Sequence, residues 1–383
     1  MNRFIIFLFF CALIGTSYEV TQGVFWSDFL CVPLFLYALF FIRKLDFKKN
    51  IVAKSSIVYS LILLLTGLLN ETCTDTIFLN FTRIFVEGTV AYTSLVIALR
   101  CNKELVFFRC LFYIFSVYFL IFSAISLTSS IELEGNFQAL DIQSGRNGMA
   151  ISNLLLVIML SFLIILSKYS KEKVLYVLFP FFIFNIFFSA SRFSVISLGL
   201  FSLFIMYWLR KKISAKGACL VLVFVAILFY VVETIMHNID SNVMEYSSEL
   251  LEDKITKNED GGFAYRLFDL NFDVINKWVQ DTPYYMLFLG DGKSITHGIF
   301  SFTFCCTGVI GFSYFVFSHI RMVLHYWHSS SICKFMSFLI FIFFFNDIVT
   351  NSRFIICVNT LLYMGMLAFM FSYNNINKQD FLK

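Results

Sequence analysis

Residues 148–166 read GMAISNLLLVIMLSFLIIL, a run without a single charged side chain. A bilayer hydrocarbon core of about 30 Å is crossed by about 20 apolar residues in an α-helix. This stretch therefore predicts a transmembrane span, with Arg146 and Lys168 at its two ends. Apolar runs between charge clusters predict twelve such spans in all, near residues 4–18, 24–42, 54–69, 77–99, 105–127, 148–166, 174–189, 193–209, 217–235, 298–320, 335–349 and 354–372.

The composition excludes most other classes of protein. Of the 383 residues, 59% are hydrophobic and 14% charged, and the mean hydropathy is +0.80. A soluble domain has about a quarter of its residues charged, so a water-soluble enzyme, a secreted scaffold and a disordered chain are excluded. The expected fold is all-α, a polytopic transmembrane helix bundle of twelve spans that forms a single transmembrane domain over residues 1–383. Its first span is either a signal peptide or, as we favour with eleven spans following, a retained anchor.

The basic residues predict the orientation in the membrane. If the N-terminus is cytoplasmic, most of the 29 Lys and Arg residues fall in cytoplasmic segments, and three fall in short outer loops. The positive-inside rule then places both termini in the cytoplasm. The long segment 236–297, between the ninth and tenth spans, faces outward as a partly helical loop.

The second half of this loop is amphipathic. After residue 262, apolar side chains recur at three- and four-residue spacing, which predicts a helix on the outer membrane surface that ends at Asp281. Arg266 lies at the start of this helix, with Asp269 and Asp273 on the same face. The guanidinium therefore either forms local salt bridges or serves as an anion ligand above the membrane.

Three outer arginines, Arg146, Arg192 and Arg353, each begin a predicted span among small or polar residues. A cation at a helix N-terminus opposes the helix dipole, so its position needs another reason. Guanidiniums that converge there would form a clamp for a phosphate or a pyrophosphate. The alternative is that each side chain snorkels to lipid headgroups.

Two charged residues fall inside the fourth predicted span. Arg83 and Glu87 lie one helical turn apart and can therefore pair. Charges at membrane depth are costly and are usually paired or functional, and a structural ion pair is the simpler interpretation here.

His297 opens the tenth span, and Gly308 and Gly311 follow it. Eleven residues of helix make close to three turns, which would place His297 and Gly308 on one face. The two glycines would permit close packing of a neighbouring helix and so direct the imidazole into the bundle. With a free pKa of about 6.5, His297 could act as a base at neutral pH, although a lone histidine is more often structural.

The order of these features resembles a known family. Ser-Ala-Ser-Arg192 begins a span, a long outer loop follows, and then come His297 and, after ten further residues, Gly308-x-x-Gly311. This resembles the bacterial O-antigen ligase and O-antigen polymerase superfamily of membrane glycosyltransferases. The segment Gly290-Asp-Gly292 is similar to the Gly-x-Gly that usually precedes the family's histidine. Two positions depart from the family pattern, which has a polar residue in place of Gly298 and often a leucine in place of Ile196.

The resemblance covers roughly residues 140–320, and it implies an activity. It implies inverting transfer of a glycan from undecaprenyl pyrophosphate at the periplasmic face of the bacterial inner membrane. His297 and Arg192 would be catalytic, and Arg146, Arg266 and Arg353 would bind the pyrophosphate. Because arginines can neutralise the leaving group, no metal or other cofactor is expected.

Three functions remain open within this framework. We favour an O-antigen polymerase, which joins lipid-linked repeat units in lipopolysaccharide biosynthesis, because polymerase sequences diverge with their sugar substrates. A ligase of the same superfamily and a flippase or transporter of lipid-linked oligosaccharide are the alternatives. The expected partners are undecaprenyl-pyrophosphate-linked oligosaccharide, membrane lipid and a chain-length regulator protein, with no nucleic acid.

Overall fold

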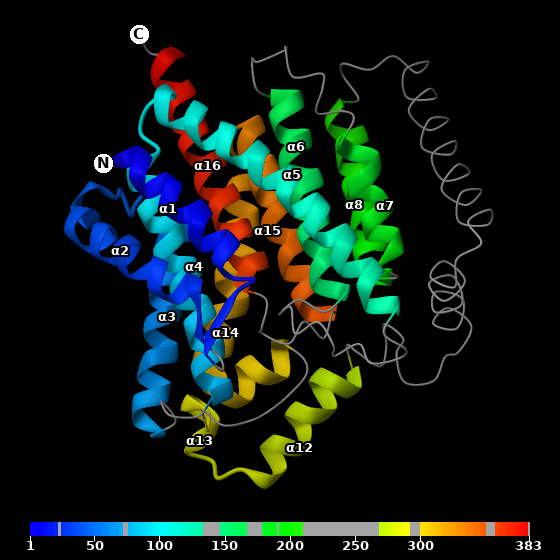
Figure 1. Ribbon diagram of the computed structural model, residues 1–383. Helices are drawn as coiled ribbons and strands as arrows, with labels where there is room; N and C mark the ends of the chain where they lie inside the picture. The colour runs from blue at the N-terminus through cyan, green and yellow to red at the C-terminus, as the bar shows by residue number, and fades with distance from the viewer. Residues whose placement is uncertain are drawn as a thin grey trace. The chain divides into compact units, whose positions relative to one another are not determined.

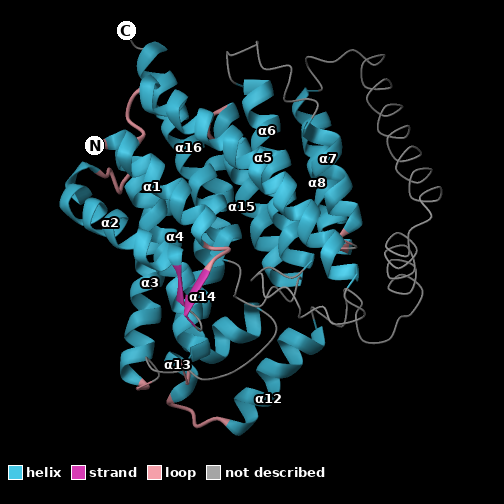
Figure 2. Cartoon of the chain, in the orientation of Figure 1, coloured by secondary structure: helices cyan, strands magenta, loops and turns pink. Residues whose placement is uncertain are grey.

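The computed structural model describes residues 1–21, 24–71, 76–132, 146–166, 178–189, 191–209, 268–291, 299–349 and 357–381. Within these ranges the chain is helical apart from connections and one two-stranded antiparallel hairpin (Figures 1 and 2). The chain divides into two compact units. Unit 1 comprises residues 1–117, 142–144 and 262–383, and unit 2 comprises residues 118–141 and 145–261.

The described elements divide between the two units. Those that lie wholly in unit 1 are α1 Asn2–Gly15, β1 Glu19–Thr21, β2 Val24–Phe25, α2 Trp26–Phe41, η1 Ile42–Lys44, α3 Ile51–Leu69, α4 Thr76–Ala98, η3 Phe268–Asp273, α12 Val274–Asp281, α13 Met286–Leu289, α14 Ile299–Trp327, α15 Ser331–Val349 and α16 Cys357–Phe381. Helix α5, Asn102–Glu132, begins in unit 1 and ends in unit 2. Unit 2 also contains α6 Arg146–Leu166, α7 Leu178–Phe188 and α8 Arg192–Leu209.

Four described helices are long and apolar enough to cross a membrane: Trp26–Lys44, Ile51–Leu69, Asn102–Ser126 and Ile299–Trp327. The prediction of an all-α membrane bundle is therefore confirmed in its coarse form. The predicted count of twelve spans is wrong for the described residues.

The physical reasons for the lower count differ between the helices. Helix α1 has 14 residues, which reach about 21 Å at 1.5 Å per residue and fall short of the hydrocarbon core. Of the predicted span 174–189, the structure describes the helical residues Leu178–Phe188. Helix α4 carries Arg83 and Glu87, and the last two turns of α16 are polar. The described apolar parts of α6, α8 and α15 have fewer than 18 residues. The predicted span 217–235 lies outside the described residues.

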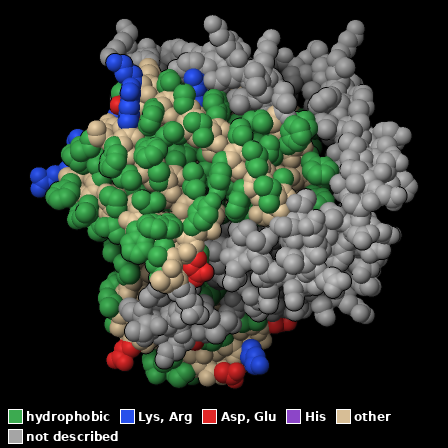
Figure 3. Space-filling view, in the orientation of Figure 1, with side chains coloured by type: hydrophobic (Ala, Val, Ile, Leu, Met, Phe, Trp, Pro, Cys, Tyr) green, Lys and Arg blue, Asp and Glu red, His purple; other side chains and the backbone are tan. Residues whose placement is uncertain are grey.

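The outer surfaces of the four long helices are apolar. Phe40 on α2, Leu68 on α3, Ile114 on α5 and Phe317 on α14 are each between 65% and 77% exposed. Figure 3 shows the same property as a broad band of hydrophobic side chains across the described surface. Soluble monomers rarely expose apolar patches of this extent. The fold thus defines the class as a helical membrane protein.

Small residues and buried hydrogen bonds hold the helices of unit 1 together. A Cβ on Gly365 of α16 would lie 2.4 Å from the ring of Phe9, and one on Gly88 of α4 would lie 2.8 Å from Thr360. These glycines let α16 approach α1 and α4 closely, as is common between membrane helices. Ser60 of α3 and Thr89 of α4 add a buried hydroxyl–hydroxyl hydrogen bond of 3.0 Å.

Charge is distributed unevenly between the two ends of unit 1. Both termini lie at one end (Figure 1), and Figure 3 shows most visible Lys and Arg side chains along that edge, with most Asp and Glu at the opposite edge. Hydrogen bonds from Tyr37 to Asn2 (3.0 Å) and from Ser330 to Asn374 (2.7 Å) join helix ends there. This distribution fits the predicted orientation, in which the basic end is cytoplasmic, and the orientation itself stays a prediction.

The predicted pair of Arg83 and Glu87 is present, but it is not the closer of two ion pairs. Arg83 Nε lies 4.0 Å from Glu87 Oε1, whereas its Nη1 donates to Asp28 Oδ2 of α2 at 3.2 Å. The guanidinium also lies over the ring of Phe25, 5.4 Å from its centre. Asp28 Oδ2 in turn accepts from the Phe25 N–H at 2.7 Å. One arginine thus fixes α4 against the start of α2.

Replacement of Arg83 by methionine is expected to destabilise the protein. The change leaves Asp28 and Glu87 largely buried without their cation, and loss of one partner of a buried ion pair costs about 3–5 kcal/mol. Both Arg83 and Asp28 retain some exposure, so the lower end of this range is expected. Thermal unfolding in detergent measures the effect against Lys103→Met, which removes an exposed cation of α5. Equal melting temperatures of the two variants would contradict the structural role of Arg83.

Candidate functional site

The five predicted site residues fall into two groups. Arg266, His297 and Arg353 lie outside the described residues. Arg146 and Arg192 are the first residues of α6 and α8, so the predicted helix starts are confirmed, while their side chains lie outside the described part.

Buried polar contacts bring the starts of α6 and α8 to one end of unit 2. Asn185, near the end of α7, donates from Nδ2 to Asn153 Oδ1 in α6 at 3.4 Å and to Ser123 Oγ at 2.8 Å. Asn153 lies two turns after Arg146, and α8 begins at Arg192 just beyond the end of α7. The backbones of Arg146 and Arg192 are therefore at the same end of this unit.

The start of α8 is lined by buried hydroxyl groups. Ser189, Ser191, Ser194 and Ser197 are each no more than 2% exposed. Ser191 precedes α8, its carbonyl accepts from the Val195 N–H at 3.1 Å, and its hydroxyl lies 3.1 Å from that of Ser194. The sequence predicts small and polar neighbours for Arg192, and the structure shows that these neighbours face the protein interior.

In unit 1, residues 268–291, the described end of the predicted outer loop, fold against the first half of α14. The chain runs through η3, α12 and α13, which all contact α14 (Figure 1). The predicted amphipathic helix is present from Phe268 to Asp281, where it ends as predicted, although its first part is a π-helix. The ring of Trp278 meets that of Phe304 edge-on at 5.8 Å. The apolar face of this helix therefore packs against α14.

Helix α14 is interrupted at Gly308. This residue has φ +65° and ψ −169°, which is not helical. The expectation of a continuous helix that places His297 and Gly308 on one face is therefore wrong at Gly308. Gly290, in the segment before His297, also has a positive φ of +76°.

The two glycines pack backbone against backbone. A Cβ on Gly308 would lie 2.4 Å from the carbonyl carbon of Phe288, and one on Gly290 would lie 2.2 Å from that of Cys306. The close approach at Gly308 thus admits the short helix α13, which contains Phe288 and lies in the segment before His297. At Gly311 the expected helix packing is confirmed, because a Cβ there would lie 3.3 Å from Ile62 of α3.

The interruption frees backbone groups that need new partners. Apolar surroundings make an unpaired N–H or C=O costly, so non-helical backbone persists at membrane depth only where other groups satisfy it. The Asp291 N–H donates to the Cys305 carbonyl at 2.9 Å. Asn70, which ends α3, donates from Nδ2 to the Gly290 carbonyl at 3.3 Å. The Gly290 segment is therefore held by both α14 and α3.

Both flanks of segment 292–298, which contains His297, are held by side chains from the outer loop. Asn271 is fully buried, and its Oδ1 accepts from the Phe300 and Ser301 N–H groups at 3.1 and 3.2 Å. It thereby caps the start of α14, a role usually taken by the residue just before a helix. On the other flank, Trp278 Nε1 donates to Asp291 Oδ2 at 2.7 Å.

Sequence reasoning missed Asn271, Trp278 and Asp291 as residues of this site. Trp278 carries a signal, since a tryptophan on an apolar face still needs a partner for its N–H when buried. Asp291 stands inside the Gly-x-Gly motif, where an acidic residue beside the motif histidine could have been noticed. Asn271 carries no local signal, because the helix that it caps starts 28 residues later.

The arrangement offers polar groups inside an apolar bundle. Thr303 and Thr307 are buried on α14 beside the interruption, and the Tyr59 hydroxyl of α3 lies next to both. Asp291 is a partly buried carboxylate within hydrogen-bonding reach of an indole. Such groups can orient a hydroxyl-rich ligand or a histidine. Within the described ranges, no three His, Cys, Asp or Glu side chains gather as a metal site would require.

Comparisons with known proteins were made by family model, by sequence and by structure, and none of the three found a match for this chain.

Alanine at Gly308 is expected to disrupt the contact with Gly290. At φ +65° and ψ −169°, a backbone conformation essentially restricted to glycine, a non-glycine residue costs about 1–3 kcal/mol. The new Cβ would also collide with the backbone of Phe288. Thermal unfolding in detergent should show a clear loss of stability. Gly199→Ala on α8 is the matched control, because nothing lies within 4 Å of its added Cβ. A Gly308→Ala protein as stable as this control would contradict the interlocked glycines.

Proposed function

We propose that this protein is a membrane glycosyltransferase that joins undecaprenyl-pyrophosphate-linked repeat units at the periplasmic face, as an O-antigen polymerase does. The proposal combines the resemblance with the helical membrane fold. Support from the structure comes from the residues around the motif, not from the catalytic side chains themselves.

The observation that carries the proposal is the contact between Gly290 and Gly308. The resemblance singles out both glycines, one before the motif histidine and one after it. In the structure their backbones interlock, and both have the positive φ that favours glycine. Motif positions separated by 17 residues thus form one structural unit with His297 between them in the chain. If the short motifs matched by chance, there would be no reason to expect Gly290 and Gly308 in contact.

The proposed reaction is a displacement at the anomeric carbon of the donor sugar. The acceptor hydroxyl oxygen forms a bond to that carbon, and the bond from the carbon to the pyrophosphate oxygen breaks. The pyrophosphate leaves with the bonding electrons, so the configuration inverts. His297 accepts the hydroxyl proton, and Arg192 stabilises the negative charge that develops on the leaving group.

The remaining residues would hold the substrates and the histidine in place. Arg146 starts its helix at the same end of unit 2 as Arg192, which suits two guanidiniums that bind one pyrophosphate. Arg266 and Arg353 are proposed as further pyrophosphate ligands. Asn271 and the Trp278–Asp291 hydrogen bond would fix the flanks of the histidine segment, because a base must be held in a defined orientation to be efficient.

His297→Ala and Arg192→Ala are expected to abolish polymerisation while leaving membrane insertion intact. The measurement is the surface-glycan ladder of a deletion strain, resolved on a gel and complemented with each variant at matched expression. The deletion strain should show core carrying one repeat unit, and only the wild-type protein should restore the ladder. His237→Ala and Arg210→Ala are the controls that should restore it. His237 lies at the beginning of the long loop 236–297, and Arg210 follows the end of α8 opposite to Arg192.

A normal ladder from a well-expressed His297→Ala or Arg192→Ala protein would remove that residue from the mechanism. Bare core in the deletion strain would instead indicate the ligase or the flippase. These two differ in the leaflet that accumulates the lipid-linked glycan, periplasmic for a blocked ligase and cytoplasmic for a blocked flippase.

Activity of the purified protein is expected to persist in a metal chelator, because arginines neutralise the pyrophosphate in the proposed mechanism. The measurement is polymer formation from lipid-linked repeat units with and without chelator. Loss of activity that a divalent cation restores would contradict this part of the proposal.

A further inference from the structure

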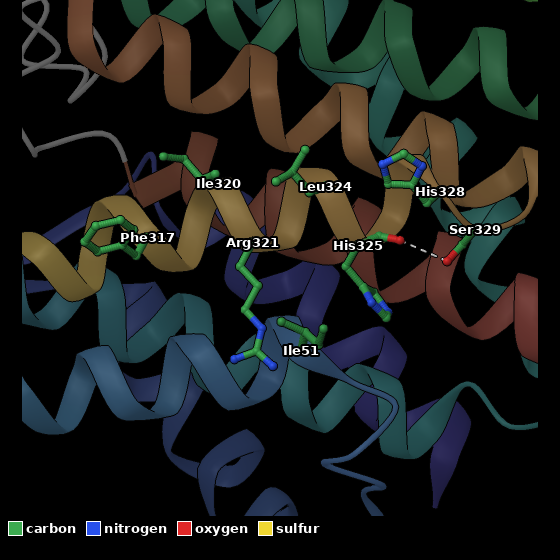
Figure 4. A pocket seen from close by; sticks show the side chains of 8 residues that line it. All are labelled: Ile51, Phe317, Ile320, Arg321, Leu324, His325, His328 and Ser329. Carbon is green, nitrogen blue, oxygen red and sulfur yellow. Dashed lines mark hydrogen bonds between the residues drawn. The ribbon is translucent and has the colours of Figure 1, made fainter.

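A second polar feature lies far along α14 from the proposed site, near the end of unit 1 that carries the termini. An open groove of about 710 Å³ runs between the last turns of α14 and the start of α3 at Ile51 (Figure 4). Most of its lining surface is apolar, and its polar side is formed by parts of Arg321, His325, His328 and Ser329. Arg321 and His325 extend from α14 toward α3 (Figure 4).

The electrostatics of this groove favour an anion. None of its lining residues is acidic, and no carboxylate in the described ranges forms an ion pair with Arg321. The guanidinium fork of Arg321 and the imidazole N–H groups suit phosphate oxygens, whereas the Ser329 hydroxyl already donates to the His325 carbonyl at 3.0 Å.

The rest of the wall is apolar and faces outward. Phe317, Ile320 and Leu324 line the groove and are 69%, 46% and 53% exposed. Phe317 and Ile320 precede Arg321 on α14, and Leu324 lies between Arg321 and His325, so the apolar side chains continue from the polar ones toward the middle of this helix. A ligand that fits both parts has an anionic head and an apolar tail.

We infer that this groove binds the headgroup phosphate of an anionic phospholipid, with an acyl chain along the apolar wall. A free phosphate would use the polar side alone and would leave the three exposed apolar side chains uncovered. Basic grooves between membrane helices are a recognised mode of anionic lipid binding. The site is separate from the proposed glycosyl transfer and does not depend on it.

The experiment is lipid retention by the full-length protein, measured by native mass spectrometry after exchange into detergent with added phosphatidylglycerol. Wild type should retain one tightly bound phosphatidylglycerol. Arg321→Gln combined with His325→Gln should weaken the apparent affinity about tenfold or more, the effect of losing one hydrogen bond to a charged group. Arg321→Lys keeps the charge but loses the planar fork, so it should show a smaller loss.

Lys103→Gln is the matched control, because it removes an exposed cation of unit 1 that does not line the groove, and it should retain the lipid. Melting temperatures in phosphatidylcholine show that each variant is folded. Equal phosphatidylglycerol retention by the double variant, or equal retention of phosphatidylcholine by wild type, would overturn the inference. A rise in melting temperature with inorganic phosphate alone that equals the rise with phosphatidylglycerol would also overturn the inference, because it would identify a free-anion site.

Discussion

The contact between Gly290 and Gly308 is the constraint on which the rest of the candidate site depends. It requires a positive φ at both residues and leaves no space for a Cβ at either. Because it interrupts a helix among apolar side chains, it also requires new partners for backbone groups. Asp291 and Asn70 meet part of that requirement. The same hydrogen bonds that make the interruption tolerable thus fix the chain just before the histidine segment.

Some buried polar side chains elsewhere in the described part of the protein join one helix to another. Arg83 joins α4 to the start of α2 through Asp28, and Asn185 joins α7 to α6 and to the end of α5. Hydrogen bonds of this kind replace the hydrophobic driving force that apolar surroundings do not provide between membrane helices. Through the Asn185 contact with α6, the two arginines that start α6 and α8 lie at the same end of unit 2.

The sequence predicted the features that depend on local pattern. Apolar runs and charge clusters located the helices, the helix starts at Arg146 and Arg192, and the amphipathic helix that ends at Asp281. The predicted number of spans was wrong for the described residues, partly because hydropathy alone does not show that α1 ends after 14 residues and is too short to cross. The prediction of a continuous helix at Gly308 was wrong for a different reason. The partner of Gly308 and the cap from Asn271 come from distant parts of the chain, and no local pattern reports such contacts.

The interruption divides α14 at Gly308, whereas the boundary between the loop and the helix lies at Ile299. Its first half, Ile299–Thr307, is fastened to the outer loop through Asn271, Trp278 and Asp291. Its second half is fastened to α15, where the Ser337 hydroxyl donates to the Val323 carbonyl at 2.7 Å. If the loop were exchanged for that of another protein, the first half of α14 would therefore have to be exchanged with it. A chimera that borrows the loop of another protein should be joined at Gly308 rather than at Ile299, so that the loop and its own half of the helix move together.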